Sequence, residues 1–207
     1  MIVDVRNDVL EMAKQSYREG LFAGTSGNLS CYDREAGAMY ITPSSIPYET
    51  MRREDIVRMT LEGEILEGEK PPSSEWRMHA EIYRCKPEVR AVVHTHSPYA
   101  TSFAVTRQKL PVILIEMVPF LGGEVEVADF AIPGTVEVGI EAVKKLQGRN
   151  ACLMANHGVL AVGADLAQAH IRAVYAEDAA KIYSLALGNG EVKIIRQEQV
   201  EKMRAGR

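Results

Sequence analysis

The chain has 207 residues, of which 46% are hydrophobic and 25% charged, so it can form a sizeable core and general disorder is excluded. Its formal net charge of -4 argues against a dedicated nucleic-acid-binding protein, which needs a concentrated positive face. We expect a single domain, residues 1–207, that has no nucleic-acid partner.

The cysteines and the N-terminus indicate a cytoplasmic protein. Cys31, Cys85 and Cys152 are odd in number and widely separated, so neither a disulfide framework nor a cysteine zinc site is indicated. Asp4 and Asp8 lie where a signal peptide needs apolar residues, and no stretch approaches the roughly 18 apolar residues of a membrane span. We therefore expect no membrane partner.

The first part of the chain predicts one helix followed by short strands. Apolar residues at helical spacing predict a helix over residues 4–19, which Gly20 ends. Short strands separated by turns are expected at 28–32, 39–42 and 56–60.

From residue 74 onward, predicted helices and strands alternate. The helices are expected over 74–85, 97–106, 134–146 and 165–187, with a short one after Gln197. The strands are expected at 89–94, 112–116, 124–128, 151–155 and 158–162. This order predicts a layered α/β domain with a central mixed or antiparallel sheet.

The histidines suggest a metal site. His94 and His96 end a run rich in valine, and residues i and i+2 of a strand point to the same face, so both imidazoles can reach one ion. His157 lies between two expected strands, and three imidazoles leave an open position, as in catalytic zinc sites. An HxH pair alone is a weak signal, and two histidines that cap a strand end are the alternative. His79 and His170 lie inside helical patterns and are interpreted as structural or surface groups.

Glu75 follows Ser73 and Ser74 directly before a predicted helix. Serine and glutamate are ordinary residues at a helix start, but neither serine has the partner three residues later that a capping box requires. The functional alternative makes Glu75 a general base beside the metal, with the helix start as an anion site.

Two loops have a similar anion-binding character, namely residues 24–28 (GTSGN) and 42–45 (TPSS). Glycine allows close approach, and hydroxyl and amide groups can hydrogen-bond phosphate oxygens. Each loop taken alone is also consistent with an ordinary turn. Neither matches the Walker or the dinucleotide-binding pattern.

Five motifs, in this order, together resemble the class II aldolase/adducin family. They are GTSGNLS (24–30), ITPSSIPYE (41–49), PPSSEW (71–76), AVVHTHSPYAT (91–101) and NHG (156–158). The resemblance extends over residues 4–187 and is greatest to the L-fuculose-1-phosphate aldolase branch. It implies a three-layer α/β/α fold with a central, largely antiparallel mixed sheet, and a homotetramer with active sites at subunit interfaces.

The resemblance also implies the roles of individual residues. His94, His96 and His157 match the ligands of one Zn²⁺ per subunit, which Mn²⁺, Co²⁺ or Fe²⁺ could replace, and Glu75 matches an acid/base glutamate that can also bind the metal. The positions that match the phosphate-binding residues are Gly27, Asn28, Ser44, Ser45, Ser73 and Ser74. Ser45 stands where the family aldolase has glycine. Glu116 stands where it has a proton-donating tyrosine from a neighbouring subunit, so it is a candidate for specificity or proton transfer.

The implied activity is reversible cleavage of a phosphorylated sugar, an L-fuculose-1-phosphate-like ketose 1-phosphate, to dihydroxyacetone phosphate and a small aldehyde. Alternatives are a 5-deoxyribulose-1-phosphate or 5-methylthioribulose-1-phosphate aldolase, and a dehydratase or epimerase of the same family. A non-catalytic adducin-like assembly domain is the alternative from another class.

Overall fold

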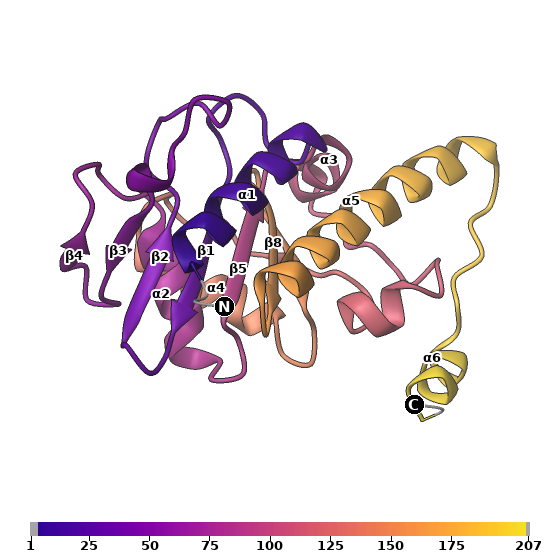
Figure 1. The fold of residues 1–207 in the computed structure, drawn as a ribbon. Coiled ribbons are helices and arrows are strands. Elements are labelled where there is room, and N and C mark those ends of the chain that lie inside the picture. The colour runs from indigo at the N-terminus through magenta and orange to yellow at the C-terminus, as the bar shows by residue number, and fades with distance from the viewer. Residues whose placement is uncertain (1–3, 206–207) are drawn as a thin grey trace.

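The computed structural model describes residues 4–205, and in this part of the chain one eight-stranded sheet lies between two layers of helices (Figure 1). The strand order is β4-β3-β2-β1-β5-β8-β7-β6. The strands are β1 (Asn28–Asp33), β2 (Ala38–Ile41), β3 (Val57–Met59), β4 (Ile65–Glu67), β5 (Ala91–Thr95), β6 (Val127–Ala128), β7 (Ala151–Met154) and β8 (Gly158–Gly163). Neighbouring strands are antiparallel except β6 and β7, which are parallel, so the expected three-layer fold with a largely antiparallel mixed sheet is confirmed.

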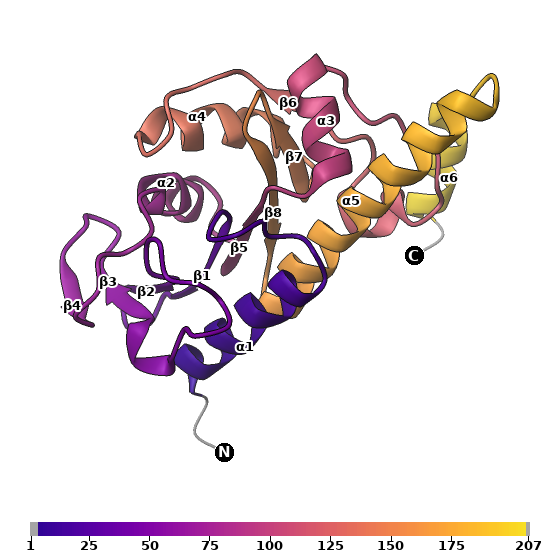
Figure 2. The ribbon, with the colours of Figure 1, turned by 90° about the horizontal axis from the view of Figure 1, so that it is seen from above.

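The helices cover both faces of the sheet (Figure 2). They are α1 (Val5–Arg18), α2 (Trp76–Cys85), α3 (Pro98–Thr106), α4 (Val136–Lys145), α5 (Leu166–Asn189) and α6 (Gln197–Ala205). Helices α1, α3 and α5 share one apolar cluster with the sheet, and α2 and α4 share a second. Side chains of a strand alternate between faces, and in β5 Val92 belongs to the second cluster whereas Val93 belongs to the first.

The first predicted helix is confirmed to within a residue or two at its ends. The side chain of Asp4 accepts a hydrogen bond from the backbone N–H of Asn7, which satisfies one of the free donors at the start of α1. After α1, Gly20 adopts a positive φ of 77°, a conformation that glycine reaches without steric cost.

One predicted strand is wrong. Residues 112–116 form no strand, and the chain continues into one π-helical turn, Met117–Leu121. Pro111 supplies no N–H for a sheet ladder, and the apolar side chains after Glu116 pack beneath α5. An apolar run of this length does not by itself distinguish a strand from a buried helical turn.

The edges of the sheet also differ from expectation. The expected strand 124–128 is reduced to β6, with one isolated bridge between Leu110 and Val125. Strand β4 is a short, exposed edge strand that the hydrophobic pattern does not indicate.

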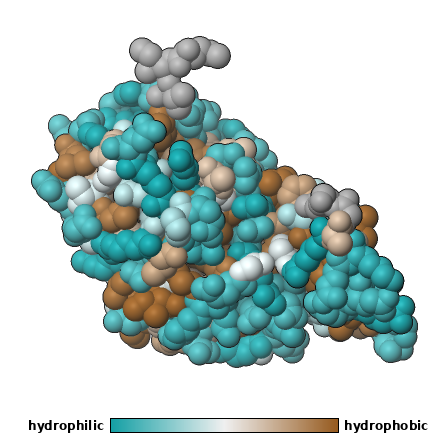
Figure 3. Space-filling view, turned by 90° about the horizontal axis from the view of Figure 1, so that it is seen from below, coloured by the Kyte–Doolittle hydropathy of each residue, from teal (hydrophilic) through white to brown (hydrophobic). Residues whose placement is uncertain are grey.

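The surface seen from below is mostly hydrophilic, with separate hydrophobic patches (Figure 3). Large apolar side chains are exposed at several positions of the molecule, among them Ile115, Phe130 and Ile132. No helix within residues 4–205 has an apolar stretch long enough to cross a bilayer.

Candidate active site

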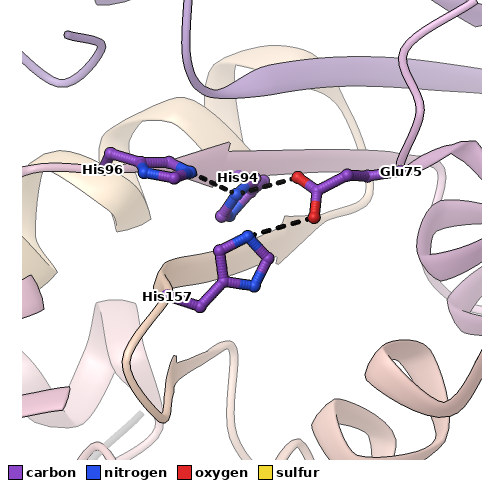
Figure 4. A group of neighbouring side chains, drawn as sticks. All are labelled: Glu75, His94, His96 and His157. Carbon is purple, nitrogen blue, oxygen red and sulfur yellow. Dashed lines mark hydrogen bonds and ion pairs between the residues drawn. The ribbon is translucent and has the colours of Figure 1, made fainter. Parts of the chain in front are cut away.

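Three histidines and one glutamate converge where β5 meets β8 (Figure 4). One nitrogen or oxygen from each of Glu75, His94, His96 and His157 lies within 4.8 Å of the others. His94 belongs to β5 and His96 follows it, His157 lies in the turn between β7 and β8, and Glu75 directly precedes α2. Sequence reasoning singled out all four residues, and the fold brings them together.

The histidine pair on β5 has the geometry that strand pleating predicts. The Nε2 atoms of His94 and His96 are 3.0 Å apart, although one residue separates them in sequence. His94 is fully buried, and its Nδ1 donates a hydrogen bond to the backbone carbonyl of Val159 at 2.9 Å. The carbonyl can only accept, so a neutral His94 ring carries its lone pair on Nε2, facing the cluster.

The residues on either side of His157 explain how its ring reaches the site. Asn156 adopts a left-handed φ of 53°, which asparagine tolerates better than most residues. A Cβ atom on Gly158 would collide with the carbonyl oxygen of Thr95 and come within 3.1 Å of the His94 ring. Glycine therefore allows β8 to start directly against the histidine pair.

Glu75 is 7% exposed and directs its carboxylate to the histidines instead of capping α2. Its Oε2 lies 3.1 Å from His94 Nε2, and its Oε1 lies 3.0 Å from His157 Nε2. Burial raises the pKa of Glu75, but His94 and His157 lower it more through charge and hydrogen bonding, so the net pKa is well below the ordinary value. Burial, with the charges of His94 and His157, lowers the pKa of His96 to about 4, so this ring is neutral at pH 7.

This donor set fits a divalent metal ion. The lone pair of His94 faces a carboxylate oxygen and another imidazole nitrogen, an arrangement that a shared cation stabilises. Within the described chain, Glu75 Oε1 is buried and makes no well-aligned hydrogen bond, although His157 is close. Three imidazole nitrogens and one carboxylate are suitable ligands for Zn²⁺ and related ions.

A cavity of about 340 Å³ opens beside the cluster. All six positions singled out for phosphate line it, namely Gly27, Asn28, Ser44, Ser45, Ser73 and Ser74. Thr25 and Ser26, which belong to the loop 24–28 singled out for its anion-binding character, also line it, as does Pro133, to which sequence reasoning assigned no role. No lysine or arginine of the described chain lines this cavity, so hydroxyl and N–H groups are its hydrogen-bond donors toward an anion.

The two loops that line the cavity, residues 24–28 and 42–45, differ in backbone strain. Gly27 has φ of 82°, and a Cβ there would lie 2.5 Å from the Phe22 ring, so glycine is required. Ser45 has φ of 59°, a left-handed conformation that is costly for serine.

The other residues singled out from the sequence, Glu116, His79 and His170, do not line this cavity. Glu116 does not line it and directly precedes the π-helical turn. His79 and His170 are both buried in helices, so the structural alternative is confirmed for them and the surface alternative is wrong. The hydrogen bonds of His79 to β1 depend on contacts between distant segments, which sequence spacing does not reveal.

Comparison with known proteins identifies the family. Residues 7–184 match the family described as Class II Aldolase and Adducin N-terminal domain. The chain is 35% identical over 198 residues to a 5-deoxy-D-ribulose 1-phosphate aldolase of Bacillus thuringiensis, covering 96% of this chain and 92% of that protein. It is also 35% identical over 201 residues to a 5-methylthioribulose-1-phosphate/5-deoxyribulose-1-phosphate aldolase of Rhodospirillum rubrum, covering 97% and 90%.

A solved structure described as L-fuculose 1-phosphate aldolase superposes with a TM-score of 0.94 at 39% identity, covering 100% of this chain and 97% of that chain. The chain therefore belongs to the class II aldolase/adducin family and is an aldolase, that is, a lyase. Aldolases of this family act on phosphorylated sugars and are generally metal dependent, in agreement with the donor set of the cluster.

Proposed function

We propose that this chain is a Zn²⁺-dependent aldolase that reversibly cleaves an L-fuculose-1-phosphate-like ketose 1-phosphate to dihydroxyacetone phosphate and a small aldehyde. One observation carries the proposal. Three imidazoles and a buried carboxylate converge beside a cavity whose loops offer hydroxyl and N–H groups but no cationic side chain. The cluster would bind the sugar end of the substrate through a metal ion, and the loops would bind its phosphate through neutral hydrogen-bond donors.

His94, His96 and His157 would hold the metal through Nε2, and Glu75 would complete the set before substrate binds. When bound, the divalent ion supplies a Lewis acid that polarises the substrate carbonyl. The carbonyl of Val159 supports the site from outside, since it fixes the tautomer in which His94 Nε2 is free to bind. Zn²⁺ is our choice over Mn²⁺, Co²⁺ or Fe²⁺ because imidazole-rich four-ligand sites are typical of it.

The six cavity positions would hold the phosphate. Ser73 and Ser74 precede the first residue of α2, where the helix dipole favours an anion, and the hydroxyl groups of Ser44 and Ser45 lie on a second loop lining the same cavity. These groups orient the substrate so that its reacting carbons lie next to the metal cluster.

Glu75 would transfer the proton of the reaction. Cleavage of the C3–C4 bond turns the C4 hydroxyl into the aldehyde and frees its proton, while the electron pair stays on C3, which must gain a proton to become the hydroxymethyl carbon of dihydroxyacetone phosphate. The ionised Glu75 carboxylate would take up the proton that is freed and deliver one to C3, so no net proton is consumed. Glu75 is the carboxylate that lines the cavity. Its Oε1 makes no well-aligned hydrogen bond that would have to break before proton transfer. In the direction of synthesis the same oxygen removes this proton.

A 5-deoxyribulose-1-phosphate or 5-methylthioribulose-1-phosphate aldolase is the second candidate. It is supported by the two relatives of those names, which match nearly the whole chain at 35% identity. The two candidates share the phosphate and metal ends of the substrate and differ in the aldehyde released.

We further propose a homotetramer with active sites at subunit interfaces. Ile132 is 64% exposed and directly precedes Pro133, which lines the cavity, and Phe130 is 54% exposed nearby in sequence. Apolar side chains beside a site suit a subunit contact. Light scattering that gives the mass of one chain would contradict this assembly.

The test is product analysis with zinc-loaded protein on three substrates: L-fuculose-1-phosphate, 5-deoxyribulose-1-phosphate and 5-methylthioribulose-1-phosphate. Release of dihydroxyacetone phosphate, coupled to NADH oxidation and abolished by a chelator, supports the aldolase, and the substrate with the highest kcat/KM identifies the aldehyde. Dehydrated or epimerised products without cleavage would contradict it.

A further inference from the structure

A buried chain of hydrogen bonds leads away from Glu75 between β1 and α2. Asn28 Nδ2 donates to Glu75 Oε2 at 3.0 Å, and Asn28 Oδ1 lies 2.5 Å from His79 Nε2. His79 Nδ1 lies 2.7 Å from Ser30 Oγ, which lies 2.6 Å from Tyr83 Oη. Asn28 is 5% exposed, and the other three side chains are fully buried.

The spacing of these residues explains why they meet. Glu75, His79 and Tyr83 follow one another at intervals of four, so they lie on one side of α2 and of the residue before it. Asn28 and Ser30 are two apart in β1 and therefore point to the same face of the sheet. The face of the helix and the face of the strand oppose each other, and each polar side chain of the row finds a partner.

The chemistry of the groups fixes the direction of every hydrogen bond. The Glu75 carboxylate can only accept, so the amide of Asn28 must present Nδ2 to it and Oδ1 to His79. His79 must then carry its proton on Nε2 and accept at Nδ1 from the Ser30 hydroxyl. Tyr83 donates in turn to Ser30, so donation runs from Tyr83 toward Glu75.

We propose that His79 is a positioning residue for Glu75 that acts through Asn28. By donating to Asn28 Oδ1, it holds the amide with Nδ2 toward Glu75, and this hydrogen bond fixes Glu75 Oε2 among the imidazoles while Oε1 is left for proton transfer. The inference deepens the proposed function and rests on it for the metal and the reaction. The arrangement of the side chains is a property of the protein alone.

Two substitutions of His79 separate positioning from simple packing. In His79→Gln the side-chain amide nitrogen can occupy the place of Nε2 and still donate to Asn28. In His79→Asn the shorter side chain reaches only the place of Nδ1, so it can accept from Ser30 but does not reach Asn28.

His170→Asn is the matched control. His170 is also buried and also contacts a serine through Nδ1, at 3.0 Å from Ser16 Oγ, but it lies in α5 on the other side of the sheet. It shares no hydrogen bond with Glu75, so it reports the effect of shortening a buried histidine that loses only its own local contacts, to Gln15 and Glu19.

The first readout is Zn²⁺ affinity, measured by competition with a chromophoric chelator and without any substrate. Loss of an outer hydrogen bond to a metal-site ligand costs about 10-fold or more in affinity, so His79→Asn is expected to weaken Zn²⁺ binding about 10-fold. His79→Gln is expected to retain most of the affinity and His170→Asn all of it. If both His79 variants lose affinity equally, or if His170→Asn loses as much as His79→Asn, the proposal is wrong.

A double-variant cycle tests the route through Asn28. Asn28→Ala is expected to weaken Zn²⁺ binding about as much as His79→Asn, and the double variant is expected to be no weaker than either alone. Independent losses that multiply to about 100-fold would overturn the proposal, because His79 would then act on the site by another path.

The second readout needs neither metal nor activity, so it separates this inference from the proposed function. Crystal structures of the metal-free variants are expected to place Glu75 Oε2 out of reach of Asn28 Nδ2 in His79→Asn and within reach in His79→Gln. An unmoved Glu75 in His79→Asn refutes the positioning role even if the protein proves to be an active aldolase. A displaced Glu75 supports that role even if no ketose 1-phosphate is cleaved.

Discussion

Replacing Ser45 with glycine should stabilise the protein, because Ser45 has a left-handed φ of 59° in an exposed loop. A residue with a Cβ atom is destabilised by about 1–2 kcal/mol in this conformation. Glycine increases the conformational entropy of the unfolded chain, which offsets about 0.5–1 kcal/mol of the gain. Among the residues that the structure describes, the Ser45 hydroxyl has one long hydrogen bond, to Ser44 Oγ at 3.4 Å on the surface, so its loss costs little.

The net gain is therefore about 0.5–1 kcal/mol in the free energy of unfolding, a rise of about 1–4 °C in Tm for a chain of this size. The assay is thermal unfolding of metal-free protein followed by circular dichroism. Arg107→Gly is the matched control, since Arg107 has the same φ of 59° at the end of α3, and is expected to gain no more because its hydrogen bond to Ala104 is lost. A Tm that falls in Ser45→Gly would refute the argument from backbone strain.

Three further outcomes follow from the site. Glu75→Gln should lower kcat about 10²- to 10⁴-fold while Zn²⁺ remains bound at saturating metal, so near-normal turnover would reject the proton-transfer role. Gly158→Ala should abolish Zn²⁺ binding, since its Cβ collides with the carbonyl of Thr95; metal analysis at normal content would contradict this. Burial lowers the pKa of His79 to about 3, from 6.5 in the unfolded chain. The contribution of His79 to the free energy of unfolding is therefore fully present above pH 6.5 and falls by about 1.4 kcal/mol per pH unit as the pH drops toward 3. Urea unfolding at several pH values checks this slope, which should be smaller by about this amount in His79→Gln, where the lowered pKa values of His96 and Glu75 still contribute.

The metal cluster was predictable because local geometry places two of its four residues together and the family resemblance indicates the other two. Strand pleating makes His94 and His96 neighbours whatever the rest of the fold does. The sequence places Glu75 directly before a helix and His157 in a turn between two strands, and the family resemblance supplied their convergence.

The parts that sequence reasoning missed depend on tertiary contacts. The hydrogen bond that links Asn28 to His79 joins residues 51 apart in sequence, which periodicity does not reveal. The segment 112–116 reads as a strand from its apolar residues, but packing against α5 and the missing N–H of Pro111 favour a turn. Strand β4 is exposed at the sheet edge, so no hydrophobic pattern marks it.

We propose that the activity of this aldolase depends on one divalent metal held by His94, His96, His157 and Glu75. The most direct test is to remove metal with a chelator and titrate Zn²⁺ back while measuring release of dihydroxyacetone phosphate from the best substrate. Activity is expected to disappear with the metal and to return linearly to a plateau at one Zn²⁺ per chain. Full activity in protein shown by elemental analysis to contain no metal would contradict it.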